Sequence, residues 1–178
     1  MAFQTITLGG GCFWCLEAVY VRVRGVTDVE SGYCNGHVLR PTYEAVCRGD
    51  TGHAEVVRLT YDDSVIGLGD LLEIFFAIHD PTTLNRQGND VGTQYRSGIY
   101  TVRDADLEFA TAWVRELSQG RVFDAPIVTE IQPLSSYSAA EAYHQDYFEK
   151  HPHQGYCSFV VAPKVQKFQH SFARWLRP

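Results

Sequence analysis

The chain has 178 residues, of which 45% are hydrophobic and 13% aromatic, enough for one sizeable core, so a single domain over residues 1–178 is expected. The formal net charge is -6, without a long run of either sign, which argues against nucleic-acid and anionic-membrane partners. The N-terminus has no signal-peptide pattern, and no stretch approaches the roughly 18 apolar residues of a membrane span. The expected location is therefore cytoplasmic.

The first predicted elements are a strand, a glycine turn and a helix. Residues 3–8 alternate in the manner of a strand, and Gly9, Gly10 and Gly11 end it before an apolar segment at residues 12–21. Gly25 predicts the end of this helix, and residues 26–33 predict a second strand.

Cys12 follows the three glycines directly. A cysteine at the start of a helix is surrounded by free backbone N–H groups and the positive end of the helix dipole, which favour the thiolate. Because the thiolate is the attacking form of cysteine, Cys12 is the expected nucleophile. The competing interpretation is a small buried thiol in a tight turn.

Cys12 and Cys15 form a C-x-x-C pair, which on its own suggests dithiol redox chemistry of the thioredoxin kind. The intervening residues, Phe13 and Trp14, are bulky aromatics that suit the apolar wall of a small pocket better than an accessible turn for disulfide exchange. The five cysteines form an odd, unevenly spread set, so they are interpreted as thiols and not as the framework of a secreted domain.

The rest of the chain alternates strands and helices. Residues 54–61 predict a strand and residues 69–79 a strongly apolar, buried helix. The long segment 81–97 has no periodicity and is a candidate wall of a functional site. The later expected elements are a strand at 99–102, a helix at 105–117, a strand at 127–131, a helix at 139–150 capped by Ser138 and Glu141, a strand at 159–162, and a C-terminal helix from Val165. This alternation favours an α/β or α+β fold with a sheet covered by helices.

Residues 11–14 (GCFW) resemble the active-site motif of the peptide methionine sulfoxide reductases of type A. Similar blocks follow in that family's order at residues 41–47 (PTYEAVC), 49–55 (GDTGHAE), 79–83 (HDPTT), 89–97 (NDVGTQYRS) and 143–145 (YHQ). The resemblance implies an α+β fold, a two-layer sandwich with a ferredoxin-like core. Its mixed, mainly antiparallel sheet is covered by helices, with long loops and a C-terminal helix.

The resemblance also implies a reaction. The chain is expected to reduce methionine S-sulfoxide, free or in proteins, to methionine, with thioredoxin as reductant and without a metal or organic cofactor. Cys12 is the implied nucleophile and Glu55 the implied acid, which protonates the sulfoxide oxygen as that oxygen gains charge. Donation at neutral pH requires that Glu55 stay protonated, so a partly buried, uncharged Glu55 is expected.

The same resemblance implies a substrate pocket. Tyr43 and Tyr95 are assigned to hydrogen-bonding the sulfoxide oxygen, and Asp90 to the same polar cluster. Phe13 and Trp14 are assigned to an apolar cradle for the S-methyl group, which would select a methyl sulfoxide by shape.

Attack leaves Cys12 as a sulfenic acid, which a second thiol must convert to a disulfide. Cys157 is the first candidate for this resolving thiol, because many members of the family carry a resolving cysteine at its place. Cys15 is the rival, since residues 158–162 are interpreted as a strand that would hold Cys157 still. Cys34 is interpreted as a bystander lining the site, and Cys47 as a structural thiol.

His144, His151 and His153 lie near Cys157 in the sequence, but their spacing is not that of a compact zinc site. No metal is therefore expected.

Two other function classes remain open. One is a thioredoxin-like dithiol-disulfide oxidoreductase that uses Cys12 and Cys15. The other is a binding module that recognises oxidised methionine without turnover. Neither explains the segments around Glu55, Asp90 and Tyr95.

Overall fold

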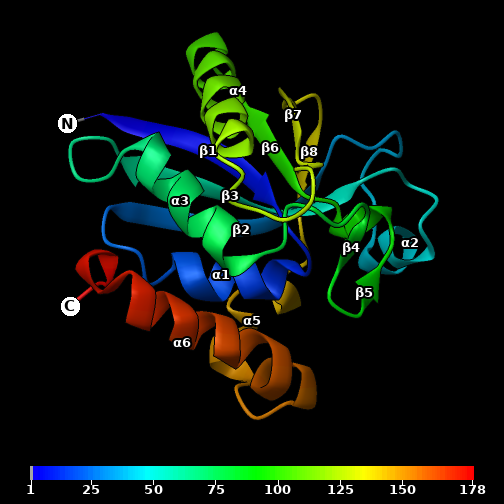
Figure 1. Ribbon diagram of the computed structural model, residues 1–178. Helices are drawn as coiled ribbons and strands as arrows, with labels where there is room; N and C mark the ends of the chain where they lie inside the picture. The colour runs from blue at the N-terminus through cyan, green and yellow to red at the C-terminus, as the bar shows by residue number, and fades with distance from the viewer. Residues whose placement is uncertain (1) are drawn as a thin grey trace.

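The computed structural model describes residues 2–178 as a sheet with helices packed on it (Figure 1). The sheet has six strands in the order β7-β6-β1-β3-β2-β8. They are β1 (Phe3–Gly9), β2 (Val26–Cys34), β3 (Ala54–Asp62), β6 (Gly98–Thr101), β7 (Glu130–Pro133) and β8 (Tyr137–Ala139). Neighbouring strands are antiparallel except β6 and β7, which are parallel. The expected α+β class with a mainly antiparallel sheet is confirmed.

The ferredoxin-like core is confirmed in the succession of elements. Along the chain β1, α1 (Phe13–Tyr20), β2, β3, α3 (Leu68–Ile78) and β6 follow one another. Their four strands lie in the order β6-β1-β3-β2, which is the split β-α-β arrangement of that core. Helix α4 (Asp104–Gln119) then leads to β7, at the outer edge of the sheet.

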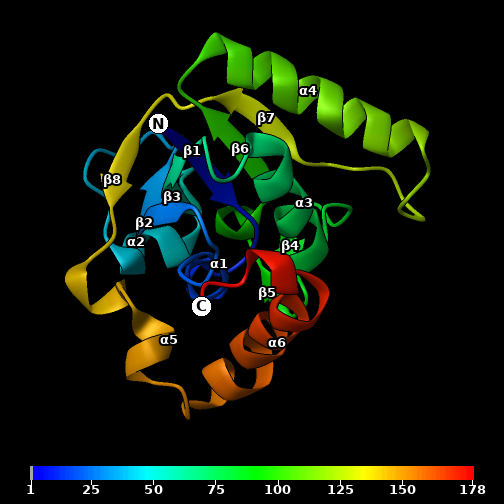
Figure 2. The same cartoon turned by 90° about the vertical axis from the view of Figure 1, so that its left-hand side faces the viewer.

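The core lies on one face of the sheet. Val57, Leu59 and Tyr61 point into it from β3, because alternate residues of a strand share a face. Helices α1 and α3 cover this face, and α6 (Ala162–Ser171) packs across both of them on the side away from the sheet (Figures 1 and 2). Helix α3 is therefore apolar nearly all round because it is covered on both sides.

The predicted helix over residues 139–150 is wrong. Strand β8 is followed by a short 3-10 turn, η2 (Ala142–His144), and by the single helical turn α5 (Tyr147–Lys150). Neither turn has a side-chain cap, so the expected capping box of Ser138 and Glu141 does not form.

Distant hydrogen bonds explain this difference. The carboxylate of Glu141 accepts from the Tyr33 hydroxyl at 2.7 Å and from the Tyr43 backbone N–H at 2.9 Å. The Gln145 side chain bonds both the N–H and the C=O of Ser31 at 3.0 Å. These bonds hold residues 141–145 beside β2. Tertiary hydrogen bonds of this kind outweigh a local preference for helix.

The predicted strand at residues 159–162 is also wrong. A π-helical turn, η3 (Cys157–Val161), runs directly into α6. Val161, Val165 and Phe168 are buried at a spacing of three or four residues, so the apolar stretch is the inner face of a helix. The turn η4 (Ala173–Trp175) ends the chain's regular structure.

The remaining elements are short. Helix α2 (Tyr43–Arg48) was not predicted, and the strand expected at 127–131 forms slightly later, as β7. The long segment 81–97 holds the two-stranded ribbon β4 (Arg86–Gln87) and β5 (Asp90–Val91), then η1 (Thr93–Tyr95). Within residues 2–178 no helix combines the length and apolar character that crossing a membrane requires.

Candidate active site

Cys12 lies where the chain leaves β1 and enters α1, as predicted. Gly11 has φ of +89° and donates its N–H to the Tyr95 carbonyl at 3.2 Å. A Cβ at Gly11 would stand 3.0 Å from the Gln87 side chain. Only glycine fits this backbone conformation at such close approach, so the turn fixes Cys12 against the 81–97 segment.

Two opposing influences act on the Cys12 thiol. The backbone N–H of Trp14, at the helix start, does lower the pKa of the Cys12 thiol. Burial is the largest influence, however, and raises this pKa well above the ordinary value, and a charge on Glu55 or Cys15 would raise it further. The side chain is only 7% exposed, so the loss of hydration destabilises a thiolate more than the N–H groups at the helix start stabilise it.

Glu55 is placed by the alternation of β3, which puts it on the same face as Val57. It is 1% exposed, so its burial is complete and not partial as expected. One carboxyl oxygen, Oε1, accepts the backbone N–H of Phe13 at 3.3 Å. The other, Oε2, is buried without a hydrogen-bond partner in residues 2–178.

Burial raises the pKa of the Glu55 carboxyl to about 8, although the bond from Phe13 opposes this and negative Asp90 adds to it. A carboxyl group with this pKa is mostly protonated at neutral pH, in line with the expected uncharged Glu55. Since Oε1 already accepts a hydrogen bond, Oε2 is the oxygen free to carry the proton. The carboxyl group therefore offers a donor to an acceptor that enters the pocket.

Tyr43 and Tyr95 approach this carboxyl group from different elements. Tyr43 opens α2, whose start is capped by the Thr42 hydroxyl accepting from the Ala45 N–H at 3.2 Å. Tyr95 closes η1. Burial first, and then the charge of Glu55, raise the pKa of both hydroxyls above the ordinary value, so both remain hydrogen-bond donors.

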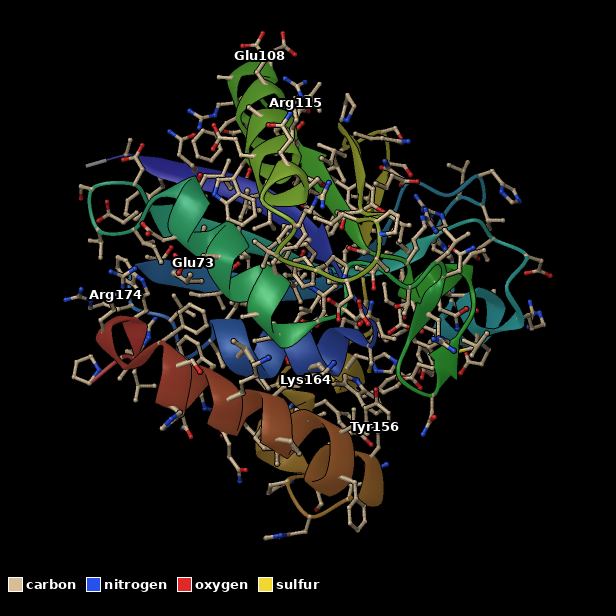
Figure 3. All side chains as sticks on the ribbon, viewed as in Figure 1. Glu73, Glu108, Arg115, Tyr156, Lys164 and Arg174 are labelled. Carbon is tan, nitrogen blue, oxygen red and sulfur yellow. The ribbon has the colours of Figure 1, made fainter. Side chains whose placement is uncertain are left out.

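Asp90 begins β5 and is partly buried. It accepts a hydrogen bond at 2.5 Å from the hydroxyl of Tyr156, whose ring meets the edge of Trp14 at 5.8 Å. Figure 3 shows Tyr156 at the start of the helical segment that continues into α6. Tyr156 was missed from the sequence, although its place directly before Cys157 was a usable signal.

The two predicted cradle residues have different surroundings. Phe13 is fully buried, with ring centroids 5.6 Å from Tyr33 and 6.3 Å from Tyr43. Trp14 is partly exposed and stacks on Tyr147 at 3.7 Å with an angle of 4°. Trp14 is therefore the more accessible of the two rings, whereas Phe13 is part of the core.

His144 fixes the orientation of the Trp14 ring. The indole Nε1–H of Trp14 donates to His144 Nδ1 at 3.0 Å, and burial lowers the pKa of His144. Its ring is neutral with the proton on Nε2, because Nδ1 accepts. The sequence suggested helix packing or a surface position for His144, but it lies buried within an aromatic cluster.

No three His, Cys, Asp or Glu side chains in the described part of the chain, residues 2–178, are grouped so that they could hold a metal ion.

Both candidate resolving thiols are buried, with Cys15 1% and Cys157 0% exposed. Burial raises the pKa of each thiol. Negative charge on Cys157 would add to the rise at Cys15, and charge on Cys15 to the rise at Cys12. Cys15 therefore lies within electrostatic reach of both other thiols.

The interpretations of the two remaining cysteines are wrong. Cys34 packs with Val56 and Tyr100 in a small second core, on the sheet face opposite the site, because alternate strand residues face opposite sides. Cys47 is exposed and not structural. Its thiol lies near the Tyr43 hydroxyl, since each group affects the pKa of the other.

Comparison with known proteins gives consistent matches. The family model described as Peptide methionine sulfoxide reductase matches residues 4–176. The chain is 56% identical over 180 residues to a Peptide methionine sulfoxide reductase MsrA of Ralstonia nicotianae, across 99% of this chain and 94% of that protein. Reduced Mxr1 of Saccharomyces cerevisiae aligns with a TM-score of 0.79 and 40% identity, over 87% and 89% of the two chains. Mxr1 in complex with Trx2 aligns with a TM-score of 0.56 and 30% identity, over 82% and 84%.

Proposed function

The chain belongs to the peptide methionine sulfoxide reductase family, and we propose that Cys12 and Glu55 form the reaction centre with which it reduces methionine sulfoxide. The observation that carries this assignment is the buried carboxyl group beside the nucleophile. Glu55 Oε1 is held by the N–H of Phe13, the residue after Cys12, while Oε2 has no partner among residues 2–178.

The first step transfers oxygen from the substrate to Cys12. The Cys12 sulfur attacks the sulfoxide and the bond between the substrate's sulfur and oxygen breaks. The oxygen ends bonded to the Cys12 sulfur, so the products are methionine and a Cys12 sulfenic acid. The substrate sulfur is reduced by two electrons and the Cys12 sulfur is oxidised by two. Glu55 donates its proton to the oxygen as negative charge develops there.

Cys12 and Glu55 together supply and accept every proton that moves in this step. A buried thiol of raised pKa and a protonated carboxyl group are both neutral before substrate arrives. Once Glu55 has given up its proton, the carboxylate takes the proton of the Cys12 thiol. Glu55 thus ends the step protonated, and no charge is left in the buried pocket, where it would be costly.

The pocket residues orient the substrate for this step. The Tyr43 and Tyr95 hydroxyls donate to the sulfoxide oxygen, and Asp90 is part of the same polar cluster through its bond with Tyr156. Trp14 and Phe13 form the apolar cradle that receives the S-methyl group and selects it by size. The S epimer at sulfur is the substrate that follows from the family.

Cys157 is the proposed resolving thiol, with Cys15 as the rival. The thiol of Cys157 condenses with the Cys12 sulfenic acid, releases water and leaves a disulfide. Since Cys157 is buried in η3, this step requires η3 to rearrange, and π-helical turns are often placed at such functional positions. Thioredoxin then reduces the disulfide; the similarity to Mxr1 in complex with Trx2 supports this partner.

The chain is proposed to act as a single domain over residues 1–178 in the cytoplasm. Its five cysteines are free thiols, which suits a reducing compartment. The packing of α6 on α1 and α3 supports one cooperative unit.

The test of this function is an assay with the two separated epimers of methionine sulfoxide. The S epimer is expected to yield methionine, and Cys12→Ser to abolish the yield. Cys34→Ser, on the sheet face opposite the site, serves as the thiol control, and circular dichroism checks that each variant folds. Turnover retained in Cys12→Ser, or reduction of the R epimer alone, contradicts the assignment.

The resolving thiol is tested by mass spectrometry after one turnover without reductant. A Cys12–Cys157 disulfide is expected. A Cys12–Cys15 disulfide would show that the rival assignment is correct.

A further inference from the structure

We infer that a groove beside the active site holds the polypeptide that carries the oxidised methionine, and that Lys164 in this groove selects a substrate with a carboxylate near the sulfoxide. The groove, called here the lysine groove, lies between the end of α3, the β4–β5 ribbon and the segment from Tyr156 to Lys167. The inference rests on the proposed function and deepens it by naming the substrate class.

The lysine groove adjoins the proposed site through two shared residues. Asp90 and Tyr156, which belong to the polar cluster of the site, also line the groove. Its volume is about 1080 Å³, whereas pockets that enclose a whole small molecule measure roughly 300 to 1,000 Å³. A single methionine sulfoxide side chain leaves most of this space free, so a longer ligand is needed to fill it.

The walls suit a polypeptide. Phe76, Phe123, Phe159 and Val160 provide apolar surface along the groove. Phe159 is 83% exposed, so its ring is accessible to a bound chain. Aromatic side chains placed in this way are typical anchors for a bound chain.

Lys164 supplies the charge selectivity. Its side chain is partly buried, and within residues 2–178 it forms no ion pair or side-chain hydrogen bond. Its positive charge lowers the pKa of the buried groups Cys15 and His79, which places the ammonium near the floor of the groove. Figure 3 shows Lys164 between α6 and the helices α1 and α3.

The other charged groups of the groove are engaged or exposed. Asp80 accepts from the N–H and the hydroxyl of Thr82 at 2.9 and 2.5 Å. Asp90 accepts from Tyr156, Lys167 donates to a backbone carbonyl, and Asp124 is exposed to solvent. Asp80, Asp90 and Asp124 keep their negative charges, so an incoming carboxylate is favoured at Lys164 itself, where a partly buried ammonium has no partner among residues 2–178.

The test uses short peptides with a central methionine sulfoxide and otherwise uncharged residues. Glu, Gln or Lys is placed two residues before or after the sulfoxide, and N-acetyl methionine sulfoxide amide is the uncharged reference. Methionine formation is followed in single turnovers of the reduced enzyme, so no reductant takes part. The variant is Lys164→Met, and the matched control is Arg115→Met, an exposed cation on α4 at the far end of the molecule (Figure 3).

The native enzyme is expected to reduce the Glu peptide about three- to fivefold faster than the Gln peptide at low substrate, and to reduce the Lys peptide more slowly still. The ratio of the Glu-peptide rate to the Gln-peptide rate is expected to approach one in Lys164→Met and to stay unchanged in Arg115→Met. In the native enzyme this ratio is expected to decrease as salt is added. Equal rates for the three peptides in the native enzyme, or a preference that survives in Lys164→Met, overturn the inference.

Two further outcomes are informative. The first shows whether the groove binds thioredoxin instead of the peptide, and the second shows whether the proposed function itself fails. If Lys164→Met slows only reduction of the oxidised enzyme by thioredoxin and leaves the peptide preference intact, the groove serves the reductant and the inference is wrong. If the reference amide is not reduced at all, the proposed function fails. Binding of the same labelled peptides to Cys12→Ser, measured by fluorescence anisotropy, then still tests the charge preference of the groove.

Discussion

Burial keeps Glu55 protonated, because an ionised carboxylate would lose its hydration in the pocket. Its pKa of about 8 means that the carboxyl group acts as an acid up to mildly alkaline pH and loses this role above it. The neighbouring tyrosines do not replace it, because burial holds their protons even more firmly. At the scale of a single residue, the pH range of the reaction is therefore set by Glu55.

The first prediction concerns Glu55→Gln, which keeps the size of the side chain but has no proton to donate. The value of kcat is expected to fall about 100-fold. The decline of kcat above about pH 8 in the native enzyme follows the Glu55 pKa and is expected to disappear in the variant. Initial rates between pH 6 and 10 on an uncharged sulfoxide measure this, with exposed Glu116→Gln as the control. An unchanged alkaline decline in Glu55→Gln contradicts the assigned role.

The second prediction concerns His144, which holds the Trp14 indole through its Nδ1 atom. In His144→Phe the ring remains but the acceptor is lost, so Trp14 is free to turn. Selectivity for methyl over ethyl sulfoxides is expected to fall about two- to tenfold, the worth of one net hydrogen bond. His144→Asn, which retains an acceptor, should restore part of it, and exposed His153→Phe should leave it unchanged. Equal selectivity in all variants shows that His144 does not position Trp14.

At the scale of elements, α1 is joined to the segment after β8 through a second buried carboxyl group. Glu17 of α1 accepts from the Ser31 hydroxyl at 3.3 Å and lies near the backbone N–H groups of Asp146 and Tyr147, which lower its pKa. Burial, with a smaller contribution from Asp146, raises the pKa of Glu17 to about 7. This side chain therefore titrates at neutral pH while holding α5, and with it Tyr147, against Trp14.

The third prediction follows from the sign of this shift. The Glu17 pKa is about 7 in the folded protein against 4.5 ordinarily, so its contribution to stability is complete below pH 4.5 and is lost as the pH rises to 7. Relative to Glu17→Gln, the free energy of unfolding of the native protein should fall by up to about 1.4 kcal/mol per pH unit between pH 5 and 7. Urea unfolding at three pH values measures the difference, with Glu116→Gln as control. Parallel pH dependences of the native protein and Glu17→Gln would rule out this role.

At the scale of the whole molecule, the C-terminal segment closes the structure over α1. Phe168 of α6 is 0% exposed and belongs to the same core as the sheet. Beyond it, the Arg24 N–H donates to the Trp175 carbonyl at 2.7 Å, and the Arg177 N–H donates to the Arg22 carbonyl at 2.9 Å. The last helix is therefore expected to unfold together with the sheet.

The fourth prediction tests this cooperativity. Phe168→Ala is expected to lower the free energy of unfolding by about 3 to 5 kcal/mol, because it leaves a cavity in the core. Unfolding should remain a single transition by near- and far-ultraviolet circular dichroism. Exposed Phe159→Ala is the matched control, with a change within about 0.5 kcal/mol. A separate early transition of the C-terminal helix would show that it is not part of one domain.

Much of the site was predictable because its signals are local. Three glycines before Cys12 define the turn and the helix start from adjacent residues alone. Glu55, by contrast, was identified as an acid only by the motif. The resemblance supplied Tyr43 and Asp90, and the site brings them together with Cys12.

The sequence by itself therefore determined the nucleophile's turn, the core strands and helices and the reaction class, since each depends on neighbouring residues or a motif. Only the tertiary structure decided the rest. Glu141 accepts a hydrogen bond from Tyr33, 108 residues away in the sequence, and the helix that the local sequence favours therefore does not form. The high pKa of Cys12 and the bond of Trp14 to His144 arise from burial, which depends on every element packed around the site. Burial is a property of the assembled fold, so no local pattern contains it.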